Sequence, residues 1–290
     1  RQVILEEMSM YHDDPEDSLQ DEFDSVIFSG HPLGMNILGT EKTVGSFKRK
    51  NFTDFVKEHL DTRKVVFSCV GNISMVKVIE LAEKHLGRIP KSTSRIKRTK
   101  FIGCPPKHVT LQRPVKQARC AMGRATYSFT DEKRSPFYML TTILGGSGMN
   151  SRLNLALREK HGFVYSIGAQ FVPFTDTGLF VISFGTEPSQ MKKSIEFVKL
   201  ELQKLRDEPL GVKQLSSSKE QILGQIAMAE ENNISIMMMM ARNLLDQRRV
   251  TSLEEIFDRV KSTSALQLQE LANEMFNEKR LSYLIMEPIK

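Results

Sequence analysis

The sequence predicts an α+β protein made of two related halves. Helical and strand-like patterns alternate along the chain, and two distant segments match each other without a gap. Residues 91–106 lack any periodic pattern and combine Ser, Thr, Lys and Arg with two adjacent prolines, as linkers do. We therefore expect a first half over residues 1–98 and a second over residues 99–290.

Apolar spacing and turn residues define the elements expected in each half. In the first half these are a helix over 1–29 with a break at Pro15, a helix over 51–60, a strand over 65–70 and a helix over 74–85 capped by Gly87. In the second half they are strands over 109–112 and 118–124, helices over 136–144 and 151–160, a hairpin of strands 163–171 and 179–185, mainly helix to Phe276 and a strand over 281–286.

The internal match joins residues 52–70 to residues 268–286 at a constant offset of 268 − 52 = 216. Apolar positions coincide, since Phe55 pairs with Leu271 and other apolar residues pair likewise. If the second unit begins near residue 104, its earlier copy would begin near 104 − 216 = −112. About a hundred residues of the first half are then expected upstream of the chain, so that the first half is incomplete.

Composition excludes several classes of function. The 41 basic and 35 acidic residues leave a net charge of +6, without the aromatic interleaving or groove-reading motif of nucleic-acid binders. A solvated basic surface is the favoured interpretation, with nucleic-acid binding as a minor alternative. The sequence contains no apolar run of about 18 residues, so it predicts no membrane span. Three scattered cysteines argue against a disulfide framework and fit a reducing compartment, so we expect a cytoplasmic protein.

Common catalytic motifs do not occur in the sequence. There is no P-loop, G-x-G-x-x-G, G-x-S-x-G or H-E-x-x-H, and no two of the six histidines stand four residues apart on an expected helix. Residues 145–148, Gly-Gly-Ser-Gly before a helix, have the composition of an anion-binding turn. Without a phosphate-loop lysine, a flexible connection is the favoured interpretation.

Three segments together resemble one family, the M16 zinc metallopeptidases (pitrilysin and mitochondrial-processing-peptidase type, inverzincins). They are RQVILEEMSMYHDDPED, HPLGMNILGTEKTV and LGGSGMNSRLNLALREKHGFVYSIGAQF. The first resembles the V-x-x-E-E helix that follows the family's H-x-x-E-H motif, and the second resembles the P-L-G and I-L-G-T-E loop. The third resembles G-G-x-x-S-R-L followed by L-R-E-K-x-G-x-x-Y-S. The resemblance covers essentially the whole chain and favours the bacterial type with two half-domains.

The resemblance implies a fold and a site. The fold would be two homologous half-domains, each a mixed, mostly antiparallel sheet with packed helices (M16 peptidase and LuxS type). Glu7 would be the distal carboxylate ligand of Zn²⁺, and Arg158 and Tyr165 would contact the substrate. In the family, the motif glutamate takes a proton from zinc-bound water, and a guanidinium and a phenol stabilise the oxyanion.

Each of these residues also has a purely structural interpretation. Glu7 would be an exposed helical glutamate. Arg158 would be a cation at a helix end that Gly162 closes, and Tyr165 would be an aromatic residue of a strand. The order of the three segments along the chain favours the functional interpretation.

The chain departs from the family pattern because it has no H-x-x-E-H. Two zinc ligands and the general base are therefore absent, and the chain alone is expected neither to hold zinc firmly nor to cleave peptides. The implied whole protein is a zinc-dependent endopeptidase of peptides or unfolded segments. It would be a homodimer, or a heterodimer with another M16 chain, whose zinc site meets Arg158 and Tyr165 of the partner. The alternatives are a member whose motif has degenerated and a non-catalytic partner subunit.

Overall fold

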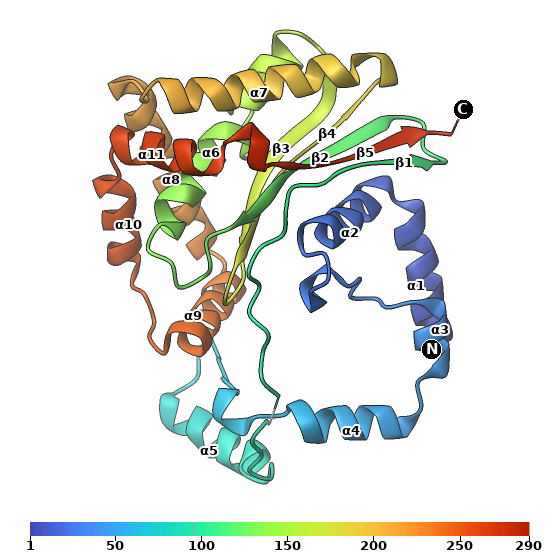
Figure 1. The fold of residues 1–290 in the computed structure, drawn as a ribbon. Helices are drawn as coiled ribbons and strands as arrows, with labels where there is room; N and C mark the ends of the chain where they lie inside the picture. Colours follow the sequence, from blue (N-terminus) through green and yellow to red (C-terminus); the bar gives the residue numbers. More distant parts are fainter. Residues whose placement is uncertain (95, 290) are drawn as a thin grey trace. The chain divides into compact units, whose positions relative to one another are not determined.

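The computed structural model describes residues 1–94 and 96–289, which fall into two compact units (Figure 1). One unit collects Arg1–Gly45, Lys100–Ser218 and the residues from Arg259 onward, and the other collects Ser46–Thr99 and Lys219–Asp258. Each unit therefore combines segments that lie far apart in the sequence. These two compact units do not coincide with the halves 1–98 and 99–290 that the internal match predicts. The division into those halves stays a prediction.

The first unit is built on one five-stranded sheet of order β1-β5-β2-β4-β3. Its strands are β1 (His108–Arg113), β2 (Ala118–Thr126), β3 (Val164–Pro173), β4 (Gly178–Thr186) and β5 (Ser282–Pro288). β1 pairs with β5 in parallel, whereas the other three pairings are antiparallel. The predicted α+β class with a mixed, mostly antiparallel sheet is confirmed for this unit, including the β3–β4 hairpin.

Helices cover both faces of this sheet (Figure 1). The helices of this unit are α1 (Gln2–Asp13), α2 (Pro15–Ile27), α3 (Glu41–Ser46), α6 (Arg134–Gly145), α7 (Met191–Asp207) and α11 (Ala265–Met275), with short turns η1 (Pro32–Gly34), η4 (Pro188–Gln190) and η5 (Glu278–Arg280). α2 packs on β2 and β5 from one side, while α6, α7 and α11 pack together on the other.

Each face of the sheet has its own apolar core. On the α2 side, Phe23 and Ile27 pack with Val181 and Leu284 in one buried cluster. On the other side, the fully buried Phe137 ring contacts four aromatic rings, those of Tyr127, Phe171, Phe180 and Phe276. Edge-to-face ring pairs add to the area that these side chains bury. The sheet is therefore a rigid base for the residues at its ends.

The second unit is helical in its described residues. It contains α4 (Arg49–His59), η2 (Thr62–Lys64), α5 (Met75–Leu86) and α9 (Asn233–Gln247), and it shares α8 (Val212–Glu230) and α10 (Leu253–Ser262) with the first unit. The strand predicted over residues 65–70 is wrong, because the structure assigns no strand there. A strand requires a partner for its backbone groups, and no described segment pairs with these residues.

Several local predictions are settled by the backbone. The break at Pro15 is confirmed, because Asp14 caps α2 by accepting the N–H groups of Glu16 (2.7 Å) and Asp17 (3.3 Å). The helix predicted over 151–160 is confirmed, and most of it is the π-helix η3 (Asn154–Glu159). Residues 96–107 and 91–94 contain no helix or strand, as a linker should. No described helix has the length and apolar character needed to cross a membrane.

Candidate functional site

Arg158 lies in the π-helix η3 (Asn154–Glu159), which contacts β3 and α7. The fully buried Leu157 anchors this turn. Gly162, with φ +60°, then reverses the chain, and the N–H of Phe163 donates to the carbonyl of Leu157 at 2.9 Å. π-helical turns are rare and concentrate at functional sites. The turn brings the end of η3 directly to the start of β3.

The Arg158 side chain is available for a ligand. About half of it is exposed (48%), and its Nε lies 3.9 Å from Oε1 of the neighbouring Glu159. An exposed ion pair at this distance contributes little. The guanidinium therefore keeps its planar set of donors for other acceptors.

Tyr165 occupies an irregular position in β3. The register passes from Val164 opposite Thr186 to Ser166 opposite Gly185, so that Tyr165 is the extra residue of a β-bulge. Bulges commonly re-aim a side chain beside an active site. The Tyr165 ring is 56% exposed. The turn at Gly162 therefore places Arg158 and Tyr165 on joined elements, as the sequence predicted for the pair.

The Tyr165 hydroxyl has a partner that the sequence pattern did not indicate. It donates a hydrogen bond of 2.7 Å to Oε1 of Glu187. That bond, and the negative charge of the carboxylate, raise the pKa of Tyr165 above its ordinary value. The phenol is thus held as a neutral hydrogen-bond donor. The only sequence signal for Glu187 is that it follows a predicted strand.

Glu7 is exposed on α1, which packs against α2 through the buried Met8. No described interaction links Glu7 to Arg158 or Tyr165. Among residues 1–94 and 96–289, no group of three or more His, Cys, Asp or Glu side chains could hold a metal ion. The residues present therefore do not make a complete zinc site, and Glu7 contributes one carboxylate at most.

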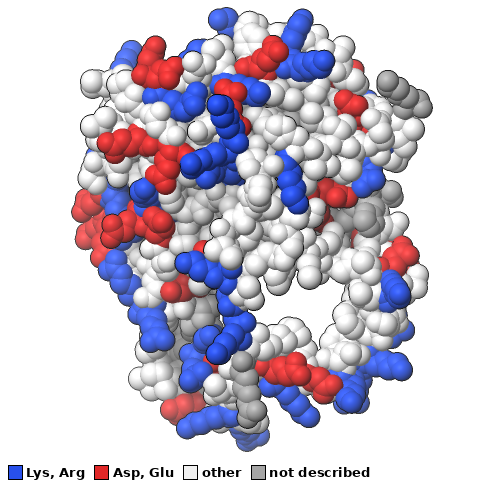
Figure 2. All heavy atoms as spheres, in the orientation of Figure 1, with Lys and Arg blue, Asp and Glu red and all other residues white. Residues whose placement is uncertain are grey.

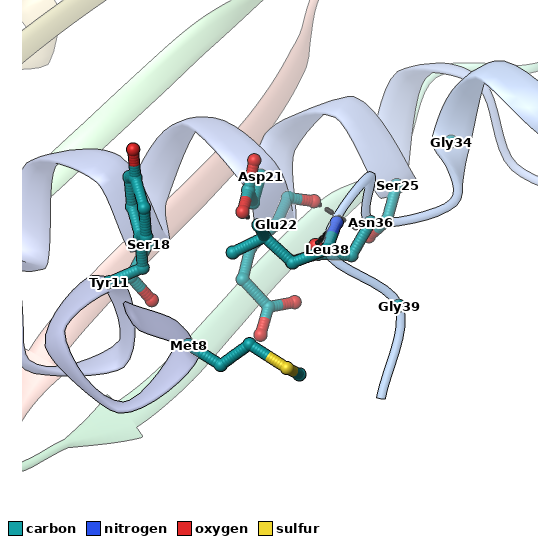
Figure 3. A pocket seen from close by; sticks show the side chains of 10 residues that line it. All are labelled: Met8, Tyr11, Ser18, Asp21, Glu22, Ser25, Gly34, Asn36, Leu38 and Gly39. Atoms are coloured by element: carbon teal, nitrogen blue, oxygen red, sulfur yellow. Dashed lines mark hydrogen bonds between the residues drawn. The ribbon is translucent and has the colours of Figure 1, made fainter. Parts of the chain in front are cut away.

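A cavity of about 150 Å³ lies beside Glu7's helix, between α1, α2 and the loop after η1 (Figure 3). Its carboxylates have partners: Asp21 accepts the amide of Asn36 at 2.8 Å, and Glu22 pairs with Arg113 at 2.8 Å. The HPLGMNILGTE segment thus closes on α2 through polar contacts. Glu7 itself does not line this cavity.

An open groove of about 460 Å³ runs between the first turn of α2 and strands β2, β4 and β3. Its walls include Glu16 and Arg119, which form an ion pair of 2.7 Å, and its floor includes Ser166, Gly168 and Gln170. β3 is an edge strand, so one side of its backbone is unused by the sheet. The sequence analysis did not predict this groove, although Ser166, Gly168 and Gln170 stand at alternate positions of the predicted strand over 163–171.

Charges of both signs are mixed on the face of the molecule that Figure 2 draws. Several basic residues have acidic partners, for example Lys133 with Glu274 at 2.7 Å and Arg249 with Glu255 at 3.2 Å. Such pairs are the usual state of a solvated surface.

Comparison with known proteins places the chain in a family. The model described as "Peptidase M16 inactive domain" matches residues 46–222. The chain belongs to the M16 peptidase family, as the three sequence segments predicted.

Two curated relatives are similar over nearly the whole chain. An "Uncharacterized zinc protease" of Rickettsia bellii is 27% identical over 285 residues, which are 98% of this chain and 68% of the relative. "Uncharacterized zinc protease YmxG" of Bacillus subtilis is 29% identical over 281 residues, 96% of this chain and 67% of the relative. The chain thus spans about two thirds of the length of either relative.

Solved structures share the fold. The peptidase M16 inactive domain from Pseudomonas fluorescens superimposes with a TM-score of 0.91 at 18% identity, covering all (100%) of this chain and 69% of that one. A chain of complex III2 from Candida albicans has a TM-score of 0.85 at 15% identity, covering 98% of this chain and 70% of that one. This fold therefore also occurs in a chain of a larger complex.

Proposed function

We propose that the protein is part of a zinc-dependent endopeptidase that cleaves peptides or unfolded segments. In this proposal Glu7 is one ligand of the zinc ion, and Arg158 and Tyr165 bind the substrate at the carbonyl that is attacked. The names of the relatives support the reaction class. The backbone irregularities at Arg158 and Tyr165 support a functional role for this pair.

The observation that carries the proposal is a repeated series of elements. α4 spans Arg49–His59 and α11 spans Ala265–Met275, and both ends differ by 216 (265 − 49 and 275 − 59). The turns that follow, η2 and η5, differ by the same offset (278 − 62 = 216). A duplication of half-domains, 1–98 and 99–290, explains both coincidences.

The caps of the two turns repeat as well. Asp61 accepts the N–H of Arg63 at 3.2 Å, and Asn277, which lies 277 − 61 = 216 residues later, accepts the N–H of Lys279 at 3.1 Å. Both are local side-chain bonds that fix the same turn. Agreement of helix ends, turn and cap supports common ancestry of the two halves better than the sequence match alone.

Equivalent positions differ in burial between the two copies. Tyr283 of β5 is 7% exposed between β1 and β2, whereas its counterpart Phe67 is 57% exposed and unpaired. An apolar face that is buried in one copy should be buried in the other. We propose that, in the whole protein, a further segment supplies the sheet of the first half-domain and carries the H-x-x-E-H motif.

The chemistry proposed for this chain is oxyanion binding. Attack on a peptide carbonyl places negative charge on its oxygen, which donors aimed at that position stabilise. Arg158 supplies fixed positive charge and a planar fork of N–H groups. Tyr165 supplies a neutral O–H, since a phenol with the ordinary pKa of about 10 is protonated at neutral pH. An extended substrate would add to the free edge of β3, beside the groove.

We propose a dimer in which the zinc ligands of one chain face Arg158 and Tyr165 of another. The proposal is supported by the solved chain of complex III2, which shares this fold and belongs to a larger complex. The partner would be an identical chain or another M16 chain. Light scattering of the whole protein tests this arrangement, and a monomer at micromolar concentration contradicts it.

A non-catalytic partner subunit is the second candidate function. The description of the matched model as an inactive domain favours it. In that case Arg158 and Tyr165 serve a zinc site on a separate chain. Reading the coding sequence upstream of this chain separates the two, because an intact H-x-x-E-H there identifies the whole protein as the enzyme.

The peptidase proposal is tested by assaying this chain and the whole protein on a peptide panel with and without zinc. We expect only the whole protein to cleave peptides. Its Glu7→Gln variant should lose both the cleavage and the bound zinc, which atomic absorption measures. The matched control is Glu196→Gln, which removes an exposed carboxylate of α7. This variant should keep both the cleavage and the zinc. Zinc-dependent cleavage by this chain alone, or full zinc content in Glu7→Gln, would overturn the assignment.

A further inference from the structure

Glu187 directly precedes the short turn η4 (Pro188–Gln190), and its side chain makes no hydrogen bond to the backbone of that turn. Its carboxylate accepts the hydroxyl of Tyr165, 22 residues earlier, at 2.7 Å. A short hydrogen bond to a charged acceptor is stronger than one between neutral groups, so this contact restrains the phenol.

The backbone fixes the two residues relative to each other. Thr186, the last residue of β4, donates its hydroxyl to the carbonyl of Phe163 just before β3 begins. Thr186 also lies opposite Val164 in the antiparallel register. Glu187 follows Thr186 and Tyr165 follows Val164, so the two residues are diagonal neighbours across the antiparallel strand pair. Long side chains at such diagonal positions are within reach of each other.

Tyr165 needs such a restraint. It is the unpaired residue of a bulge and is 56% exposed, so few packing contacts select one orientation of its side chain. A donor that must meet a developing oxyanion is effective only when it is held close to the productive geometry. A charge-assisted hydrogen bond of this length is strong enough to favour one orientation.

We propose that Glu187 is a positioning residue for Tyr165, which holds the phenol O–H in place until the substrate's carbonyl oxygen replaces the carboxylate as its acceptor. The inference rests on the proposed function, because it assumes that Tyr165 binds the oxyanion. No proton is transferred in this exchange. The O–H bond of Tyr165 stays intact and only its acceptor changes.

The first test follows the ionisation of Tyr165 itself. Ultraviolet absorbance at alkaline pH measures the ionisation of all the tyrosines. Subtracting the titration curve of Tyr165→Phe from that of the unchanged protein isolates the phenol of Tyr165. We expect Glu187→Ala to lower the pKa of Tyr165 toward the ordinary value of about 10, and Glu187→Gln to lower it less, since an amide oxygen still accepts the bond. Glu196→Gln should leave it unchanged. An unchanged Tyr165 titration in Glu187→Ala would overturn the proposal, with far-ultraviolet circular dichroism confirming that each variant is folded.

The second test uses peptide cleavage by the whole protein. We expect Glu187→Ala to lower kcat/KM roughly three- to tenfold, the net value of one hydrogen bond, and to have no further effect in the Tyr165→Phe background. Independent effects of the two substitutions would show that Glu187 acts through something else. If the whole protein cleaves nothing, the proposed function fails, whereas the titration still decides whether Glu187 holds Tyr165.

Discussion

Leu271 and Phe55 occupy the same position in the two copies of the repeat (271 − 55 = 216), and the structure predicts opposite consequences for their truncation. Leu271 is 3% exposed on α11, which packs against α6 and α7, whereas Phe55 is 59% exposed on α4. Truncation to alanine therefore opens a cavity at one position and removes mainly solvated surface at the other.

The magnitudes follow from burial. Leu271→Ala should cost about 3 kcal/mol, within the range of roughly 2–5 kcal/mol for buried leucines. A unit of about 200 residues shifts by roughly 2–4 °C per kcal/mol, so the midpoint should fall by about 6–12 °C. Phe55 stacks on His59 with ring centroids 4.0 Å apart. Loss of that exposed pair should cost at most about 1 kcal/mol.

Differential scanning calorimetry and far-ultraviolet circular dichroism measure the unfolding midpoint of both variants. Two methods are used because the two units can unfold in separate transitions. In the whole protein, where we propose that a further segment covers α4, Phe55→Ala should become as costly as Leu271→Ala. Equal destabilisation by the two substitutions in the present chain would refute the burial argument. A neutral Phe55→Ala in the whole protein would refute the proposed covering segment.

Three further predictions concern single sites. Gly123→Ala should lower the free energy of unfolding by roughly 1–3 kcal/mol in urea unfolding, because its Cβ would stand 1.9 Å from the Phe180 carbonyl oxygen. Gly224→Ala, in open space on α8, should instead raise the free energy of unfolding. Burial raises the pKa of Asp24 from 3.8 to about 6. Between these two values the unfolded chain binds this proton less than the folded protein does, so the free energy of unfolding falls as the pH rises. Asp24→Asn should abolish that fall in urea titrations at several pH values, and an identical slope in both proteins would contradict the assignment. In the proposed peptide cleavage by the whole protein, Arg158→Lys should lower kcat while the substrate KM changes less, since lysine keeps the charge but lacks the planar fork.

The helices that the sequence predicted best are those whose signals are local. The break at Pro15, the helix from Ser74 and the turn before Gly178 each depend on residues within a few positions of one another. Capping and turn preferences act over such distances whatever the rest of the chain does. The match at offset 216 was also visible, because apolar positions coincide along the two segments.

Residues 65–70 mark the limit of such signals. These β-branched residues align with residues 281–286 in the internal match, yet only β5 is a strand, because only β5 has β1 and β2 beside it. Strand formation depends on a partner that sequence propensity does not contain.

The candidate site divides in the same way. The sequence by itself determined the family and the residue types Glu7, Arg158 and Tyr165, since motif order is a property of the chain. Only the tertiary structure decided that Arg158 lies in a π-helix, that Tyr165 is the extra residue of a bulge and that Glu187 accepts its hydroxyl. The bulge at Tyr165 depends on the register of β3 against β4, and register is fixed by packing between segments of the chain.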